Sequence, residues 1–102
     1  MAKFVLAYRG GSMAATPEAQ EAAMQAWTGW FATLGGAVVD AGNPFGPSTS
    51  VASDGAAAAA ASALTGYSIV EAGDLRLAAE LAADCPVLAA GGSVDVYEAL
   101  PM

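Results

Sequence analysis

The sequence contains no histidine, a single cysteine and only three basic residues among its 102 positions. Without histidine, the chain lacks the commonest general base and the commonest transition-metal ligand. One cysteine, Cys85, excludes an intrachain disulfide and a cysteine-based zinc site, and it fits a reducing, cytoplasmic environment. We therefore predict no cofactor and no transition-metal site, since the remaining oxygen ligands suit calcium or magnesium.

Positive charge is scarce and scattered. Lys3, Arg9 and Arg76 stand against ten acidic residues, which gives a net charge of −7. Nucleic acids and anionic membrane surfaces are bound through clusters of basic side chains, so we expect the chain to bind neither. The longest uncharged stretch, 22–39, is interrupted by polar residues and a Gly-Gly pair, and is interpreted as the end of a soluble helix. The apolar run 4–8 is shorter than that of a signal peptide, which favours a cytoplasmic location.

Large apolar side chains are also few. Alanine supplies 27 residues, whereas valine, leucine, isoleucine and phenylalanine together supply 20. A chain of this length is expected to form one domain, 1–102, and alanine leaves the core of that domain thin. Because a thin core gives marginal stability in isolation, association with a second copy is favoured.

Segments typical of strands and helices alternate along the chain. In the first strand, Phe4, Leu6 and Tyr8 share one face and Val5 and Ala7 share the other. Hydrophobic periodicity and capping residues predict strands at 3–9, 37–41, 66–71 and 93–98, and helices at 17–34 and 75–84. The segment 48–63 contains six consecutive alanines; we interpret it as an irregular connection, with a short strand at 50–51 or an alanine helix as open alternatives.

The resulting order, β-α-β followed by β-α-β, is that of a ferredoxin-like α+β fold. In this fold, a four-stranded antiparallel sheet carries two helices on one face. The other sheet face would be half apolar and uncovered, which makes it a predicted association surface. We expect a second copy to cover it, giving a homodimer built as a dimeric α+β barrel.

Several short segments, in this order and spacing, resemble one known family. They are the opening strand ending at Tyr8, Trp27-Thr-Gly-Trp30, Leu34-Gly35, Asp40-Ala41-Gly42, Gly66-Tyr-Ser-Ile-Val70, Asp84-Cys85-Pro86 and Gly91-Gly-Ser-Val-Asp-Val96. Together they span nearly the whole chain and resemble the YCII-related family. The resemblance implies a dimeric α+β barrel with the ferredoxin-like topology.

The chain departs from that family at two places. Some members carry a histidine on the first helix and an aspartate directly before the proline that follows the second helix, a pair proposed to be catalytic. At the matching positions this chain has Trp27 and Cys85, and neither can perform the chemistry of that pair. The resemblance thus implies the fold and a dimer, but it does not imply an enzymatic activity.

Strand carboxylates are the remaining candidates for acid–base chemistry. Asp40 lies at the end of a predicted strand, and burial inside a barrel would raise its pKa and make it a possible general base. Asp95 alternates with valines and shares a predicted face with Ser93 and Tyr97. Both carboxylates could instead be ordinary solvated acids. We predict Cys85 to be a small buried hydrophobic residue at the end of the second helix, without thiolate chemistry.

Ligand-binding candidates surround these carboxylates. Arg9 could bind a carboxylate, although an ion pair with Asp40 across the sheet is the favoured interpretation. The residues that recur at helical spacing on the apolar face of the first helix are Ala23, Met24, Trp27, Trp30, Phe31 and Leu34. This stripe predicts Trp27 and Phe31 in the core and Trp30 at the edge of a pocket. The full set of candidates for ligand binding is Tyr8, Arg9, Trp30, Asn43, Phe45, Tyr67 and Ser93.

Three hypotheses on function remain open. The first is a YCII-like domain that binds a small organic molecule in a dimer cavity without a defined catalytic centre. The second is a cofactor-free enzyme, such as a lyase, isomerase or dehalogenase, that uses Asp40 or Asp95 with Tyr8 or Tyr67. The third is a purely structural interaction domain. A pocket with two convergent polar groups would favour the second, and a sheet face filled by the partner would favour the third.

Overall fold

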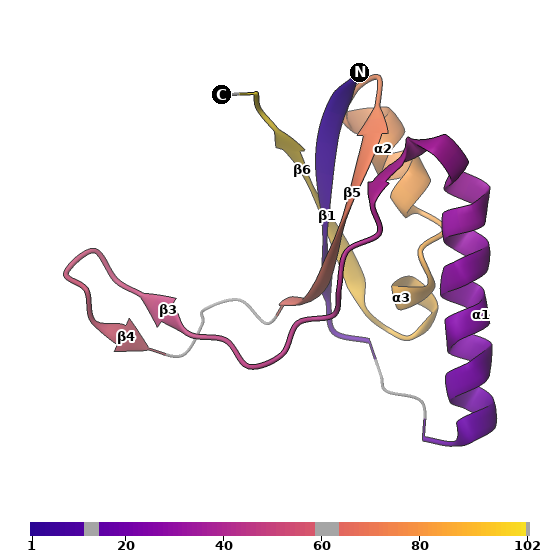
Figure 1. Cartoon of the computed structure of the whole chain (residues 1–102), viewed down its shortest axis with the longest axis horizontal. Helices are drawn as coiled ribbons and strands as arrows, with labels where there is room; N and C mark the ends of the chain where they lie inside the picture. The colour runs from indigo at the N-terminus through magenta and orange to yellow at the C-terminus, as the bar shows by residue number, and fades with distance from the viewer. Residues whose placement is uncertain (12–14, 59–63, 102) are drawn as a thin grey trace.

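The computed structural model describes residues 1–11, 15–58 and 64–101. A sheet lies on one side of the molecule and the helices lie on the other (Figure 1). The elements, in chain order, are β1 (Ala2–Arg9), α1 (Pro17–Leu34), the short 3-10 helix η1 (Gly35–Ala37), β2 (Val38–Asp40), β3 (Ser50–Val51), β4 (Ala57–Ala58), β5 (Leu64–Ala72), α2 (Leu75–Ala82), α3 (Pro86–Ala89) and β6 (Ser93–Ala99).

The main sheet has four antiparallel strands in the order β2-β5-β1-β6. The predicted α+β class and the four-stranded antiparallel sheet are therefore confirmed, and the strand order is compatible with a ferredoxin-like fold. All four strands differ from their predicted bounds. The strands predicted at 3–9 and 93–98 are each one residue longer, and the strand predicted at 66–71 extends further at both ends. The strand predicted at 37–41 is shorter, because η1 occupies its first residue and β2 ends at Asp40.

The core lies between the sheet and the helices. Alternation along β1 turns Phe4, Leu6 and Tyr8 toward the helices, where all three are buried. Thr16 caps α1, since its side chain accepts a hydrogen bond from the backbone N–H of Ala19 (3.1 Å). At the other end, Gly35 takes a positive φ of 56°, which ends the helix.

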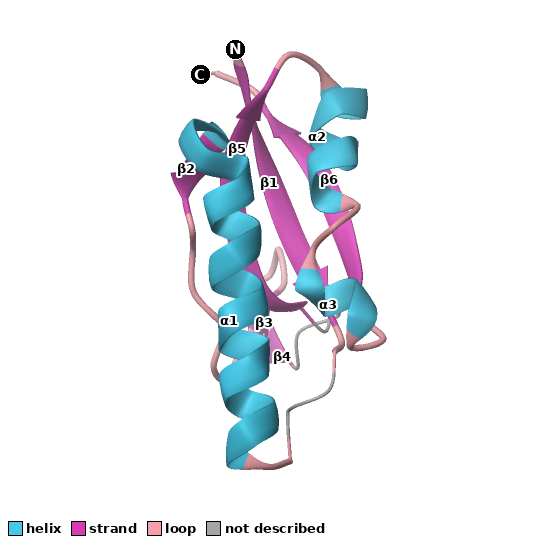
Figure 2. Cartoon of the chain, turned by 90° about the vertical axis from the view of Figure 1, so that its right-hand side faces the viewer, coloured by secondary structure: helices cyan, strands magenta, loops and turns pink. Residues whose placement is uncertain are grey.

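The N-terminal half of α1 extends beyond the end of the sheet (Figure 2). The prediction that Ala23 and Met24 belong to the buried stripe is consequently wrong: both are exposed, and Met24 is 70% exposed. Burial begins one turn later, at Trp27 and Trp30. Helical periodicity identified the correct face but not the length over which the sheet covers it.

The helix predicted at 75–84 is shorter, and a further helix follows it. Asp74 caps α2 by accepting from the backbone N–H of Leu77 (2.8 Å), and the helix ends at Ala82. Pro86 then opens α3, because proline is well accommodated at the first helical position. Cys85 is the residue before this proline, so its predicted position at the end of the second helix is corrected to the start of α3.

Residues 49–58 form a hairpin, here called the arm, that projects from the sheet (Figure 1). The predicted short strand at 50–51 is confirmed as β3. Its partner β4 belongs to the alanine run, so neither the irregular connection nor the helix describes residues 57–58. The turn forms because Gly55 accepts a positive φ of 87° and donates its backbone N–H to the carbonyl of Ala52 (2.9 Å). The rest of the predicted connection, 59–63, lies outside the described residues.

Candidate functional site

The structure divides the predicted site residues among three places. Two groups lie on the sheet face opposite the helices, here called the open face. Asp40, Asn43, Phe45 and Tyr67 gather at the β2–β5 edge, whereas Arg9, Ser93 and Asp95 lie on β1 and β6. The last two, Tyr8 and Trp30, are buried in the core beneath the helices.

The first group contains an aromatic–carboxylate cluster made of Asp40, Phe45 and Tyr67. The Tyr67 hydroxyl donates a hydrogen bond to Oδ2 of Asp40 (3.4 Å), and the backbone N–H of Gly42 donates to Oδ1 (2.8 Å). The ring of Phe45 stacks on that of Tyr67, with centroids 5.7 Å apart and planes at 19°. An exposed carboxylate therefore lies beside two parallel aromatic rings.

Backbone contacts hold this cluster against β5. The N–H of Tyr67 donates to the carbonyl of Asn43 (3.3 Å), and the N–H of Phe45 donates to the carbonyl of Thr65 (2.9 Å). At Gly42, with a φ of 79°, a Cβ atom would lie 1.7 Å from the carbonyl oxygen of Tyr67. Only glycine permits this approach, so Gly42 is the residue that brings the cluster together.

Two of the three basic side chains contact carboxylates other than Asp40. Among the described residues, Arg9 pairs with Asp95 and Arg76 pairs with Glu80, and no basic group lies within ion-pair distance of Asp40. The carboxylate of Asp40 thus has only neutral hydrogen-bond donors among its described neighbours. The sequence analysis paired Asp40 with Tyr67 only as one of several combinations, and it did not place Phe45 beside them, because 22 residues or more separate Tyr67 from the other two.

Arg9 and Asp95 form an ion pair on the open face. Nε of Arg9 donates to Oδ2 of Asp95 (2.6 Å), and this contact raises the pKa of the guanidinium. The predicted pair between Arg9 and Asp40 is wrong for a reason of register. In the sheet Asp95 lies opposite Ala7, one diagonal step from Arg9, whereas Asp40 lies beyond β5. The predicted row of Ser93, Asp95 and Tyr97 does share this face.

Tyr8 lies in the core and does not reach the open face. Its hydroxyl donates to Oγ of Ser68 (2.6 Å), and Ser68 donates to the carbonyl of Ala41 (2.6 Å). Burial raises the pKa of Tyr8 to about 12. The prediction that Tyr8 binds a ligand is therefore corrected: it is a core residue with a satisfied hydroxyl. Ser68, which the sequence analysis missed, could have been found from its alternation with Val70 on β5.

Trp27 and Phe31 pack against the core as predicted, although both are only partly buried, whereas the prediction for Trp30 is wrong. Trp30, predicted at the edge of a pocket, is only 6% exposed, and its Nε1 donates to the carbonyl of Leu81 (3.1 Å). Trp27 is only partly buried, and its ring makes an edge contact with Tyr8, with centroids 5.1 Å apart. Trp30 is more buried than Trp27 because of how α1 is rotated about its own axis, and the packing of the helix on the sheet sets that rotation.

Cys85 is buried, as predicted, and burial raises the pKa of its thiol to about 11. A thiol of this kind remains protonated at neutral pH and has no nucleophilic role. Its burial fits the interpretation of a small hydrophobic residue.

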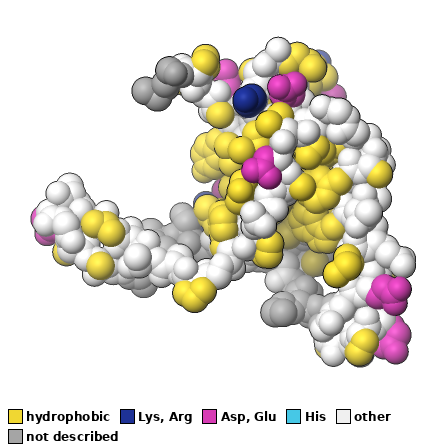
Figure 3. Space-filling model, viewed as in Figure 1, with side chains coloured by type: hydrophobic (Ala, Val, Ile, Leu, Met, Phe, Trp, Pro, Cys, Tyr) yellow, Lys and Arg dark blue, Asp and Glu magenta, His cyan; other side chains and the backbone are white. Residues whose placement is uncertain are grey.

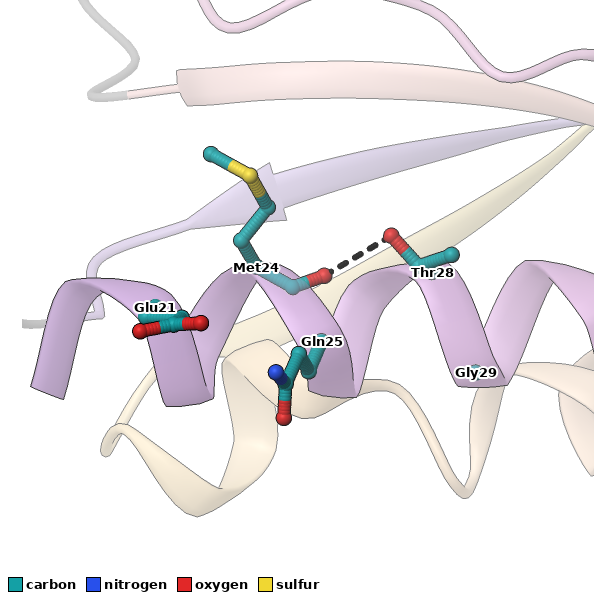
Figure 4. A pocket seen from close by; sticks show the side chains of 5 residues that line it. All are labelled: Glu21, Met24, Gln25, Thr28 and Gly29. Carbon is teal, nitrogen blue, oxygen red and sulfur yellow. Dashed lines mark hydrogen bonds between the residues drawn. The ribbon is translucent and has the colours of Figure 1, made fainter. Parts of the chain in front are cut away.

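An open groove of about 450 Å³ lies on the exposed face of α1 (Figure 4). Its lining consists of Glu21, Met24, Gln25, Thr28 and Gly29. The Thr28 hydroxyl donates to the backbone carbonyl of Met24 (2.9 Å), so this polar group of the groove already has a partner within the helix. None of the predicted site residues lines this groove, and the groove does not connect to the aromatic–carboxylate cluster.

Across residues 1–11, 15–58 and 64–101, no three acidic, cysteine or histidine side chains converge as metal ligands would. Within the same residues, no helix combines the length and hydrophobicity needed to cross a membrane. Comparisons with known protein families, curated proteins and solved structures find no match for this chain.

Proposed function

We propose that this chain is a homodimeric, YCII-like binding domain of ferredoxin-like topology, whose two open faces together enclose a small organic molecule. The observation that carries the proposal is the aromatic–carboxylate cluster on a sheet face that no described helix covers. In this proposal the domain has no catalytic centre of its own and acts in the cytoplasm.

The composition of the open face supports a partner. Apolar and aromatic side chains of three neighbouring strands lie on this face: Val5, Ala7, Tyr67, Ile69 and Tyr97. Most of them are partly exposed, and Tyr97 is 57% exposed. Contiguous exposed apolar surface on a small domain is typical of an association site. A second copy that packs the same face against this one would remove it from water.

The cluster also suggests the class of ligand. The negative faces of two aromatic rings and an adjacent carboxylate all favour a positive charge. Because no described basic side chain neutralises Asp40, a ligand ammonium could hydrogen-bond to it while the flat part of the ligand packs on Phe45. We therefore propose a small organic amine with an aromatic or flat ring as the ligand.

The same contacts weigh against the alternative of a strand carboxylate as a catalytic base. Asp95 is engaged by Arg9, and Tyr8 lies in the core, so neither is available to a substrate on the open face. Asp40 remains accessible, but the one acid–base group that contacts it among the described residues is the Tyr67 phenol, which donates to it (3.4 Å); no second carboxylate or basic side chain joins them. Binding is the chemistry that this arrangement supports best.

The dimer is tested by size-exclusion chromatography with light scattering at micromolar concentration. We expect a mass twice the 10.0 kDa of the chain. A monomer under these conditions would contradict the proposed assembly. A dimer that binds nothing and buries the whole open face would instead favour a purely structural domain.

The ligand class is tested by amide NMR titration with two isosteric compounds, tyramine and 4-hydroxyphenylacetate, which differ in the sign of their charge. We expect tyramine to shift the resonances of residues 40–45 and 67 and the acid to shift none. Asp40→Asn should weaken amine binding about tenfold, because a charge-assisted hydrogen bond is lost. Asp84→Asn, which removes an exposed carboxylate away from the cluster, is the matched control. Equal responses to amine and acid would refute the proposed site.

A further inference from the structure

Within the part of the chain that the structure describes, no contact outside the arm explains its projecting position. Every described residue from 46 to 58 is exposed, and Val51, its largest apolar residue, is 66% exposed. Its hydrogen bonds stay within the arm, for example from the backbone N–H of Ala52 to the carbonyl of Ala56 (2.8 Å) and from the Thr49 hydroxyl to the carbonyl of Ala58 (3.1 Å). Two strands of two residues each are too short to be stable alone in water. Contact with a further surface would stabilise the arm.

The surface area of the chain is also larger than a compact monomer would have. The accessible area is 6694 Å², whereas a monomer of 10.0 kDa has about 5,200 Å². The radius of gyration is 14.9 Å, against about 13 Å for a compact domain of this length. A stable dimer hides about 800 Å² on each partner. The excess area is thus large enough to supply one side of a dimer interface.

The arm lies on the same side of the sheet as the open face. In Figure 1 it projects away from the helices, and Figure 3 shows a hollow between it and the sheet. The segment that leads into it leaves the sheet where Pro44 bridges Gly66, next to Tyr8 and Arg9. The opposite end of the sheet, where β1 begins, carries Lys3. The arm and the open face therefore form one concave surface on each chain.

We propose that two copies of this chain exchange their arms, so that each arm lies against the sheet of the other copy. A two-fold axis perpendicular to the strands reverses the strand direction of the second sheet relative to the first. Both arms then make the same contact with the sheet of the other copy. Each arm, which starts at the Arg9 end of its own sheet, then reaches the Lys3 end of the partner sheet. Val51 and the arm alanines pack on the apolar residues of that face.

Charge complementarity supports this orientation. Asp54 at the turn is the one charged residue of the arm. Lys3 is the one basic side chain without an ion pair among the described residues, because Arg9 and Arg76 are already paired. In the exchanged dimer, Asp54 approaches Lys3 of the partner subunit. The proposed function supplies the dimer on which this inference rests, and the inference adds what holds that dimer together.

The main experiment measures the dimer dissociation constant by sedimentation equilibrium for the full chain and three variants. In the first, residues 50–58 are replaced by Gly-Ser. This short linker can close the gap, because the hydrogen bond between Thr49 and Ala58 shows that the two ends of the arm lie close together. The second is Val51→Asp. The third, Met24→Asp, is the matched control, since Met24 is equally exposed but lies on α1. We expect the first two changes to weaken the dimer at least about tenfold and the control to leave it unchanged.

The outcomes separate the inference from the proposed function. If the armless chain dimerises as tightly as the full chain and still binds tyramine, the exchange is wrong and the proposed function stands. If the full chain is a monomer, the proposed dimer and the exchange both fail. An arm that rests on its own sheet, or on a different protein, would likewise leave the dissociation constant unchanged and overturn the exchange.

A charge-reversal pair tests the orientation. We expect Lys3→Glu and Asp54→Lys to weaken the dimer individually and to restore it in combination, because the double variant recreates an opposite-charge pair across the interface. A double variant that is as weak as the worse single variant would overturn the perpendicular two-fold axis.

Discussion

The buried hydroxyl pair of Tyr8 and Ser68 makes a quantitative prediction about stability. Tyr8→Phe removes one hydrogen bond but leaves Ser68 donating to the carbonyl of Ala41. A single neutral hydrogen bond contributes about 1 kcal/mol, and we expect Tyr8→Phe to lower the free energy of unfolding by that amount.

Ser68→Ala should cost about 3 kcal/mol, because it removes both hydrogen bonds and leaves the Tyr8 hydroxyl buried without an acceptor. Ser68 is fully buried and Tyr8 is 5% exposed, so water cannot replace the lost partner. In the double variant the phenol hydroxyl is absent too, and no unsatisfied donor remains. Its cost should be about 2 kcal/mol, well below the sum of the single variants.

Urea denaturation followed by tryptophan fluorescence measures these differences, since Trp27 and Trp30 pack beside this core. Protein concentration is held constant, because dimerisation would add to the apparent stability. Additive costs in the double variant, or a larger loss for Tyr8→Phe than for Ser68→Ala, would refute the argument that Ser68 is the central group of the pair.

Three further results are expected. Gly42→Ala should destabilise the fold by about 2 kcal/mol or more, since its Cβ would meet the Tyr67 carbonyl at a positive φ, whereas Gly36→Ala, which meets nothing, should be neutral in the same urea assay. Stability should fall between about pH 9 and 12. Burial raises the pKa of Cys85 from 9.0 to about 11 and that of Tyr8 from 10.0 to about 12, so the unfolded chain loses these protons before the folded chain does. Urea midpoints that stay constant over this pH range would contradict the prediction. The Cys85 thiol should react with a disulfide reagent at pH 8 far more slowly in the native chain than in guanidinium, and equal rates would show that it is accessible.

The sequence predicted those features that depend on neighbouring residues. Alternation along β1 identified the buried face of Phe4, Leu6 and Tyr8, and the Thr16-Pro17 pair located the start of α1. The α+β class followed from the order of such segments. These predictions succeeded because side-chain direction in a strand and capping at a helix start are set within a few residues.

The sequence was less informative about the ends of elements and about exposure. Helical periodicity extended the buried stripe of α1 to Ala23 and Met24, which the sheet does not reach, and it assigned Trp30 to a pocket edge although Trp30 is the more buried tryptophan. Periodicity defines a helix face but not where a second layer begins. That position depends on how far the sheet extends beneath the helix.

Contacts between distant residues were decided by the tertiary structure alone. Strand register gave Arg9 the partner Asp95 in place of Asp40, because a diagonal neighbour on the adjacent strand is closer than a residue beyond β5. The close approach of Gly42 to β5 brought Asp40 and Tyr67 together. The sequence by itself thus determined which side chains could serve a site, namely carboxylates and aromatics without histidine. Which of them meet was determined by register and backbone approach, since these depend on the packing of the whole sheet and not on any local pattern.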